Sequence, residues 1–433
     1  MLGSKEEGEI IVEAGNRDMR KKRILMIAYH FPPLAGSSGI QRTLRFVQHL
    51  PTFGWEPIVL TAHPRAYERT SNDLLLEVPE DVVVHRAFAL DAARHLSIGG
   101  RYPRFLARPD RWMSWRWGAV AAGLRLIQRY QPAVLWSTYP IATAHQIGAI
   151  LHQRSGLPWV ADFRDPMAQE GYPAHPKVWQ SFKAIEETAF QRAAYCVFTS
   201  PGAIRYYGQR YPAIPSERLA LVENGYDEES FAGLDASAKT KGPLHPGRIT
   251  LLHSGIVYPS ERDPTQLFQG IGILLKSGQL SPARFILRLR ATAHDDELRS
   301  LAVEYGITDV IELAPPLPYR EALEEMLRAD GLLVLQAANC NDQIPAKLYE
   351  YLRAGRPILG LTDPAGDTAQ VLRQAGYRYL ARLDSSEQIA KVLLSFLGGV
   401  ETGTALRPRL EQATSASRRN RTKLLADLLE NNH

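Results

Sequence analysis

Short apolar runs alternate along this chain with stretches in which apolar residues recur at helical spacing. The run at 23–28 is compact and apolar, and the apolar residues after it recur every three to four positions, at Ile40, Leu44, Val47 and Leu50. A short apolar run is typical of a buried strand, whereas the longer recurrence is typical of one face of a helix. Their alternation predicts an α/β fold with a parallel, doubly wound sheet.

The alternation occurs twice, which predicts two α/β domains of similar size in tandem. In the first half we expect strands at 23–28, 57–61, 82–84, 133–137, 158–162 and 196–199, and helices at 40–50, 113–130, 141–154 and 177–194. The pattern then restarts, and we expect strands at 249–253, 284–289, 310–313, 331–335 and 357–361.

Changes in composition set the expected domain boundaries. Residues 1–22 carry mixed charge without an apolar stretch, which predicts a disordered leader and not a signal peptide. Translation from Met19 is an equal alternative. Residues 232–247 are rich in Gly, Ala, Lys and Pro and are expected to form a linker. The predicted domains are therefore 23–231 and 248–400, followed by a tail at 401–433 that contains a helix.

Composition narrows the class of protein. With 433 residues, 45% of them hydrophobic, the chain is long enough for two or three domains with large cores. Its two cysteines provide neither a disulfide framework nor a metal motif, which favours a reducing, cytoplasmic compartment. No apolar run approaches the ~18 residues of a membrane span. The net charge of +5 is too nearly balanced to favour nucleic acid as a partner.

The stretch at 347–359 carries the most informative local signal. Leu348 and Leu352 give a short helix its apolar face, Gly355 ends it, and an apolar strand follows. Glu350 falls in the first helical turn, where the helix dipole stabilises a carboxylate. At the mouth of a parallel sheet, such a carboxylate can accept hydrogen bonds from two neighbouring sugar hydroxyls. The alternative is a capping charge on an ordinary surface helix.

A glycine-containing loop follows the first strand of each predicted domain. Gly36 and Gly39 lie between a strand and a helix, where backbone N–H groups can approach an anion; a plain tight turn is the alternative. Arg42, one turn into that helix, can hold a phosphate or be solvated. In the second domain Gly255 precedes Arg262, an arrangement that suits a diphosphate, although Arg262 can instead pair with a neighbouring acid.

Taken together, these motifs resemble glycosyltransferase family 4, a group of retaining nucleotide-sugar enzymes with the GT-B fold. The resemblance implies two tandem Rossmann-like, doubly wound domains facing a cleft. The resemblance covers residues 23–395 and rests on five sequence features. They are Tyr-His-Phe-Pro-Pro at 29–33 with the glycines after it, Val-Glu-Asn-Gly-Tyr-Asp at 222–227, the carboxylates Asp342 and Glu350 with seven residues between them, Gly-Arg-Pro at 355–357, and Asp-Phe-Arg-Asp-Pro at 162–166. The last run is similar to a subgroup of N-acetylfucosamine-type transferases of surface polysaccharide synthesis.

The resemblance implies a function and a donor site. It implies transfer of a hexosyl or N-acetylhexosaminyl group, with retention, from a nucleotide diphosphate donor to a sugar or lipid-linked acceptor. The pathway would be exopolysaccharide, capsule or lipopolysaccharide synthesis. Gly255, Lys347 and Glu350 would bind the donor in the second domain, together with Gly36 and Gly39 of the first.

The resemblance also implies acceptor-binding and catalytic residues. Arg42 and Arg164 would bind the acceptor, and Arg262, Asp165 and Asp342 would take part in catalysis. The diphosphate would leave from the front face, stabilised by Arg262 and loop amides. Asp165 either orients the acceptor hydroxyl or caps a helix before the proline that follows it. Since the chain has no Asp-x-Asp motif, we expect neither a metal nor another cofactor.

Three positions depart from the family pattern, and two other functions stay open. Asp342 stands where many members have Glu, Ile256 where many have Arg, and Arg164 where many have His. These departures support a catalytically inactive scaffold in a polysaccharide-assembly complex. The other alternative is a nucleotide-sugar epimerase, which shares the GT-B architecture and needs no acceptor.

A basic, aromatic segment lies at 101–130. It holds seven arginines and three tryptophans but one acid, Asp110. Cations beside indoles suit a lipid headgroup boundary, which predicts peripheral contact with an anionic membrane at the inner face of the cell membrane. The alternative is a helix that packs its tryptophans into the first domain.

Overall fold

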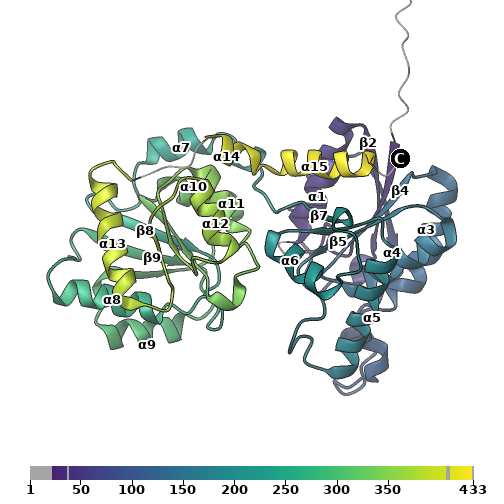
Figure 1. The fold of residues 1–433 in the computed structure, drawn as a ribbon, viewed down its shortest axis with the longest axis horizontal. Helices are drawn as coiled ribbons and strands as arrows, with labels where there is room; N and C mark the ends of the chain where they lie inside the picture. The colour runs from purple at the N-terminus through teal and green to yellow at the C-terminus, as the bar shows by residue number, and fades with distance from the viewer. Residues whose placement is uncertain (1–21, 37–38, 406–409, 432–433) are drawn as a thin grey trace, which may run out of the picture.

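Two parallel sheets, each covered by helices on both faces, make up the computed structural model (Figure 1). The structure describes residues 22–36, 39–405 and 410–431. The predicted α/β class and the two-domain arrangement are confirmed. The predicted leader lies outside the described residues, except for Lys22, which begins the first strand.

The first sheet has seven strands in the order β3-β2-β1-β4-β5-β6-β7. Its strands are β1 (Lys22–Ile27), β2 (Trp55–Ala62), β3 (Val83–Ala87), β4 (Val134–Thr138), β5 (Trp159–Arg164), β6 (Tyr195–Phe198) and β7 (Leu219–Leu221). Its helices are α1 (Gly39–His49), α2 (Ala92–His95), α3 (Trp115–Tyr130), α4 (Ala142–Ser155), α5 (Pro176–Arg192) and α6 (Pro201–Arg210). Six strands and four long helices lie where the pattern predicts them, and β7 was not predicted.

The second sheet has six strands in the order β10-β9-β8-β11-β12-β13. Its strands are β8 (Ile249–Ser254), β9 (Phe285–Arg290), β10 (Ile311–Ala314), β11 (Gly331–Leu335), β12 (Ile358–Leu361) and β13 (Leu380–Ala381). Its helices are α7 (Leu234–Lys241), α8 (Thr265–Lys276), α9 (Asp295–Tyr305), α10 (Tyr319–Arg328), α11 (Lys347–Ala354), α12 (Asp367–Gln374) and α13 (Ser386–Glu401).

Alternating side chains of the strands fill two layers of core on each sheet. In β1, Leu25 and Ile27 face the layer that holds α3 to α6, and Ile24 and Met26 face the layer that holds α1. In the second sheet one face is covered by α8, α9 and α13, and the other by α7, α10, α11 and α12. Both faces are apolar because the strands are buried on both sides, as is usual for parallel sheets.

The segment predicted as a linker from its composition is partly helical. Helix α7 packs against α10, and Leu234 and Ala238 are buried in the core of the second domain. Ser237 and Lys241 both bond to Glu324 of α10, at 2.6 and 2.9 Å. This half of the segment expected to be a linker is therefore a short helix docked on the second domain, and the helix was not predicted.

The C-terminal tail returns to the first domain. Helices α14 (Leu410–Ser415) and α15 (Arg418–Glu430) follow the second sheet, and α15 runs back beside α1 (Figure 1). Leu425, Ala426 and Leu429 are buried in the first-domain core. The helix in the tail was predicted, whereas its return across the domain boundary was not.

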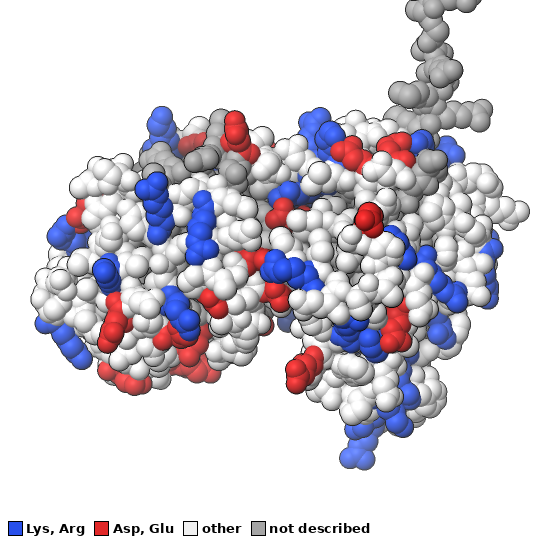
Figure 2. Space-filling view, viewed as in Figure 1, with Lys and Arg blue, Asp and Glu red and all other residues white. Residues whose placement is uncertain are grey.

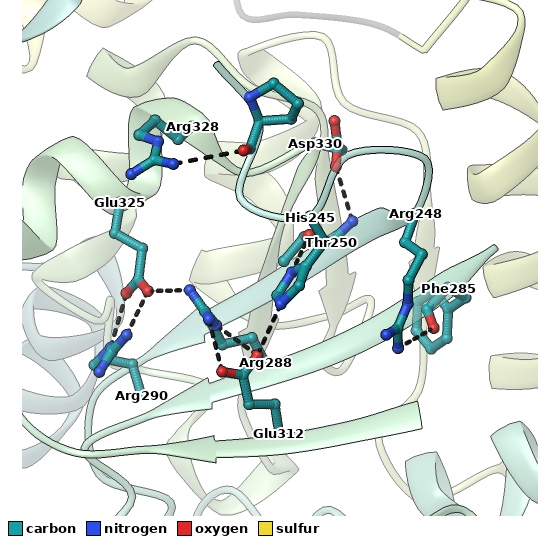
Figure 3. Close-up of polar contacts among 11 residues, drawn as sticks. His245, Arg248, Thr250, Phe285, Arg288, Arg290, Glu312, Glu325, Arg328 and Asp330 are labelled. Atoms are coloured by element: carbon teal, nitrogen blue, oxygen red, sulfur yellow. Dashed lines mark hydrogen bonds and ion pairs between the residues drawn. The ribbon is translucent and has the colours of Figure 1, made fainter. Parts of the chain in front are cut away.

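One edge of the second sheet is joined to α10 by ion pairs (Figure 3). Arg290 and Arg288 of β9 both bind Glu325 of α10, at 2.5 and 2.8 Å, and Arg288 also binds Glu312 of β10 at 2.6 Å. His245 Nε2 lies 3.3 Å from Glu312. Since every carboxylate meets a guanidinium, the cost of removing these charges from water is offset. The network fixes α10, whose N-terminal end faces the first domain.

Candidate functional site

A cleft of about 760 Å³ separates the two domains. It is lined by the β1–α1 loop with Gly36, by Arg164 at the end of β5 and Asp165 after it, and by residues at the N-terminal ends of α10 and α11. All these segments follow the carboxyl ends of parallel strands, which is where open α/β sheets bind ligands. A narrower cavity adjoins the cleft, shares Arg164 and Asp165 with it, and adds Arg262 and Asp342.

Glu350 lines the cleft from the first turn of α11. The Tyr319 hydroxyl donates to its Oε1 at 2.8 Å. Burial raises the pKa of the Glu350 carboxyl, and the Tyr319 hydrogen bond partly opposes that shift. Gly355 ends the helix with φ +65°, as the sequence predicts. Glu350 therefore lines the cleft from α11, and its role in binding donor hydroxyls stays a prediction.

A cation that the sequence analysis missed faces Glu350 across the cleft. Arg418 begins α15, and its backbone N–H donates to the Tyr226 carbonyl at 2.7 Å, which ties the tail to the segment between the domains. Its side chain lines the same cleft as Glu350 and Tyr319. Burial lowers the pKa of the Arg418 guanidinium to about 10, so it stays charged near neutrality. No local motif marks this residue, because only the returning tail brings it to the site.

Lys347 and Gly255 meet at the carboxyl end of β8. Gly255 has φ +120°, and a Cβ there would lie 2.7 Å from Lys347 Nζ, so only glycine fits without displacing the lysine. Lys347 Nζ lies 3.2 Å from His253 Nε2. His253 Nδ1 is 2.9 Å from the Leu333 carbonyl, so Nδ1 carries the imidazole proton and Nε2 accepts from Lys347. Burial and the nearby Arg262 lower the pKa of Lys347 to about 7.

Arg262 lines the narrower cavity next to this lysine. Its Nη1 donates to the Ile256 carbonyl at 2.7 Å, and the guanidinium lies 5.2 Å from the Tyr258 ring centroid. The predicted alternative, a pair with a neighbouring acid, is not among the ion pairs of the described residues. Arg262, Lys347 and the Gly255 backbone together form an electropositive corner that suits an anionic group such as a diphosphate.

On the first-domain side, Arg164 and Asp165 line both cavities. Arg164 has φ +59°, Nη1 lies 3.4 Å from the Tyr139 carbonyl, and its buried Nε has no hydrogen-bond partner among the described residues. No helix begins after Asp165, since the chain stays irregular until α5 begins at Pro176. The alternative role of Asp165 as a helix cap is therefore wrong.

Arg42 is a correction to the predicted acceptor site. Its side chain is 3% exposed and binds both carboxylate oxygens of Asp162, with Nε–Oδ2 at 3.0 Å and Nη2–Oδ1 at 2.7 Å. Nη1 donates to the Glu223 carbonyl at 3.2 Å. A buried guanidinium needs a counter-charge, and Asp162 provides it. The Arg42 side chain is therefore held in this pair and does not line the cleft.

Asp342 and Glu350 line adjacent cavities and not a common one. The Asp342 carboxylate lies 3.2 Å from Arg205 of α6, and its backbone carbonyl accepts from the Ser200 hydroxyl at 2.6 Å. Both partners belong to the first domain. That these two carboxylates bracket a nucleotide sugar stays a prediction. The contacts of Asp342 with Arg205 and Ser200 join the two domains and were not predicted.

The two glycines predicted for donor binding differ in their surroundings. Gly36 has φ +81° and lines the cleft. Gly39 begins α1 and is covered, because a Cβ there would lie 2.4 Å from Arg164 Nη1 and 2.6 Å from His30 Nδ1. Gly39 therefore permits the close approach of Arg164, and it does not itself line the cleft. Residues 37–38 lie outside the described residues.

Two sequence expectations concern metal ions and the membrane. Among the described residues no group of three or more His, Cys, Asp or Glu side chains could hold a metal ion. Metal-independent chemistry stays a prediction. No helix in the described ranges is long and apolar enough to span a membrane.

Comparison with known proteins supports the family resemblance in the first domain. Residues 38–225 match the family model described as glycosyl transferase 4-like domain. No curated protein sequence matches this chain.

Solved structures with the same architecture cover nearly the whole chain. Sucrose-phosphate synthase from Thermosynechococcus elongatus has a TM-score of 0.65 and 14% identity, over 95% of this chain and 98% of that one. Anabaena HepE in complex with UDP has a TM-score of 0.66 and 12% identity, over 95% and 100%. WaaG, a glycosyltransferase involved in lipopolysaccharide biosynthesis, has a TM-score of 0.59 and 15% identity, over 94% and 99%. The chain therefore has the GT-B fold.

Proposed function

We propose that this chain is a retaining glycosyltransferase. It transfers a hexosyl or N-acetylhexosaminyl group from a nucleotide diphosphate donor, bound in the second domain, to an acceptor bound in the first. The match of residues 38–225 to the glycosyl transferase 4-like model supports the class of reaction. The UDP bound to HepE, a protein of the same fold, supports a nucleotide-sugar donor.

The observation that carries the proposal is the electropositive corner at the carboxyl end of β8. Gly255, Lys347 and Arg262 converge there, and Glu350 projects into the cleft three residues after Lys347. A donor whose diphosphate meets Lys347 and Arg262 can place its ribose hydroxyls near Glu350. Negative charge grows on the diphosphate as the sugar bond breaks, so the two cations stabilise the transition state more than the bound donor.

The first domain supplies the acceptor side of the same cleft. Asp165 lines both cavities, which supports a role in accepting a hydrogen bond from the attacking hydroxyl. Arg164 beside it supplies positive charge. We include Asp342 as a catalytic candidate because it lines the narrower cavity, although Arg205 is its present partner.

The proposal extends to the pathway, the compartment and the metal requirement. The likeness to WaaG and the motif at 162–166 favour exopolysaccharide, capsule or lipopolysaccharide synthesis, with a sugar or lipid-linked acceptor. Both cysteines, Cys196 and Cys340, are free and buried, as suits a cytoplasmic enzyme. Peripheral contact with an anionic membrane and activity without a metal belong to the same proposal.

The test is incubation of the purified protein with a panel of nucleotide sugars and with sugar and lipid-linked acceptors. Mass spectrometry separates acceptor-dependent transfer from donor interconversion and from no reaction. Interconversion without an acceptor would indicate the epimerase alternative, and no reaction with any donor would indicate the scaffold. The anomeric configuration of an isolated product, measured by NMR, tests retention.

Two controls make this test specific to the cleft. Arg262→Ala should lower turnover more than it weakens donor binding, whereas Arg378→Ala, an exposed arginine elsewhere in the second domain, should change neither. Transfer should persist in EDTA. Loss in EDTA with rescue by Mg²⁺ or Mn²⁺ would contradict the metal-independent part of the proposal.

A further inference from the structure

A second cavity, of about 1030 Å³, lies in the first domain apart from the cleft. It is formed by residues 100–112 and by the start of α5 at 175–178, and it shares no lining residue with the cleft or the narrower cavity. Both segments belong to the lower end of the first domain in Figure 1, where Figure 2 shows Lys and Arg side chains.

Four cations line this cavity without an acidic partner. They are Arg101, Arg104, Arg108 and Lys177, and none forms an ion pair within the described residues. Arg108 is half-buried and the other three are exposed at the rim. Four like charges around one cavity repel one another, so a bound anion would lower the electrostatic energy of this part of the domain.

Two further charged side chains line the cavity, and its one carboxylate, Asp110, can offset at most one of the four positive charges. Asp110 accepts from the Thr143 backbone N–H at 2.8 Å, and its other oxygen accepts from the Trp112 N–H at 3.0 Å. Arg111 is paired with Asp91 at 2.5 Å and with Glu68 at 2.7 Å. Both side chains are therefore committed to other parts of the first domain.

His175 joins the two segments that form the cavity wall. Its Nε2 lies 3.1 Å from Arg104 Nη1, and its Nδ1 lies 3.2 Å from the Lys177 backbone nitrogen. These contacts hold the segment that carries Arg104 against the one that carries Lys177, so that both cations face the same cavity.

We propose that this cavity binds a phosphate or diphosphate group, either on a soluble ligand or as the headgroup of a lipid. Arg104, Arg108 and Lys177 donate to the phosphate oxygens, and Arg101 adds charge at the rim. Tyr102 and Trp112 line the same cavity and offer apolar surface to the rest of the ligand. The site goes beyond the transfer reaction proposed for the cleft, and its geometry does not depend on that reaction.

The test uses inorganic pyrophosphate as the probe, with binding measured by calorimetry at low salt. The site variant is Arg104→Gln, Arg108→Gln and Lys177→Gln together. The control variant removes the same charge from exposed cations of the second domain, with Lys276→Gln, Arg378→Gln and Lys391→Gln. Arg262→Ala reports any binding of the probe to the cleft.

One binding component should be weakened about tenfold or more in the site variant. It should persist in the control variant and in Arg262→Ala, whether or not the protein transfers sugar. Equal pyrophosphate binding by the site and control variants would overturn the proposal. Circular dichroism and the midpoint of thermal unfolding show whether the site variant is folded, and a single Lys177→Gln substitution on the exposed rim provides a milder test.

Sedimentation with vesicles separates the two sources of phosphate. The vesicles contain phosphatidylcholine with or without phosphatidylglycerol, and the same variants are compared. Binding to anionic vesicles that is lost in the site variant and blocked by pyrophosphate assigns the phosphate to a lipid. Pyrophosphate binding without vesicle binding assigns it to a soluble ligand. Vesicle binding that falls equally in the site and control variants, and that pyrophosphate does not block, would overturn the proposal in favour of general charge attraction.

Discussion

The backbone N–H of Gly202, in the first domain, donates to the carboxylate of Asp367 in the second domain, with an N···O distance of 2.5 Å. Asp367 is 1% exposed, and its other oxygen binds Arg205 at 2.7 Å. The carboxylate of one domain therefore occupies the positive N-terminal end of α6 in the other, an arrangement that the helix dipole favours. Asp342 meets the same arginine at 3.2 Å, so the contact lies beside the narrower cavity.

Gly202→Ala should push the domains apart and lower turnover. A Cβ at this position would lie 2.4 Å from Asp342 Cα, which is backbone and cannot move aside alone. We expect a larger radius of gyration in small-angle scattering and a loss of turnover on the order of tenfold to hundredfold, because the reacting groups come from both domains. Gly208→Ala is the matched control, since a Cβ there meets only Leu219 Cδ1 at 3.9 Å. Unchanged scattering and turnover in Gly202→Ala would show that the domains do not work in this arrangement.

Glu350→Ala should weaken binding of the nucleotide sugar by about 1.5–3 kcal/mol. The ribose hydroxyls would lose their hydrogen bonds to the carboxylate and would stay buried without a partner. Calorimetric titration with the nucleotide sugar measures the change. Glu321→Ala is the control, since Glu321 is an exposed carboxylate on the neighbouring helix α10. Donor affinity that is the same in both folded variants would remove Glu350 from the donor site.

Lys347 should make nucleotide binding depend on pH. Its pKa is lowered to about 7, so its ammonium is present below that pH and is lost above it. A bound diphosphate stabilises the ammonium and raises this pKa, so binding at pH 8 should take up a proton. UDP affinity should fall between pH 7 and 9 by up to about tenfold per unit. The phosphates are already ionised in that range, since their second pKa is about 6.

Calorimetry in buffers of different ionisation enthalpy measures the proton uptake directly. Lys347→Arg keeps the positive charge and should flatten the pH dependence. Lys347→Met should bind UDP weakly at every pH in the range. Proton uptake that is unchanged in Lys347→Arg would assign the titration to another group.

The parts of the fold that were predicted are those specified by local pattern. Apolar runs predict eleven strands of the two sheets. Gly355 marks the end of α11 because the residue that follows this helix adopts a left-handed conformation, which glycine tolerates. β7 and β13 were missed because runs of three and two residues are too short to show a period. α7 was missed because Gly, Lys and Pro dominate the composition of its surroundings.

The site was predicted where its residues follow strand ends and missed where distant segments meet. Glu350 and Asp165 follow strands, and both line the cleft. Arg42 also follows a strand, but its partner Asp162 lies 120 positions away, so no local pattern could show that its charge is already used. Arg418 was missed because it lies far along the chain from the other cleft residues, and only the return of α15 brings it to the cleft.

Acid should weaken the ion-pair network that holds α10. Hydrogen bonds from Arg288 hold the pKa of Glu312 below its ordinary value of 4.5. A carboxylate whose pKa is lowered by folding stabilises the protein at pH values above 4.5. This contribution is lost as the pH falls through the folded-state pKa. Glu312→Gln should therefore lower the free energy of unfolding at pH 7, and its difference from wild type should shrink below pH 4.5. Urea unfolding at several pH values measures this, and Glu401→Gln, an exposed ion-pair partner of Arg284, is the control. A difference that stays constant with pH would exclude the Glu312 carboxylate as its source.

Asp165→Asn should lower turnover by about a hundredfold or more while the protein stays folded. As a helix cap Asp165 could be replaced by Asn with little effect, but no helix begins there, so the chemical role is the one left to test. The amide keeps the size of the side chain and loses its capacity to accept a proton from the acceptor hydroxyl. Asp73→Asn is the control, because Asp73 lines the same cleft on the first domain. Turnover is measured at saturating donor, together with the midpoint of thermal unfolding. Full activity in a folded Asp165→Asn variant would mean that another group, such as the donor phosphate, takes the proton.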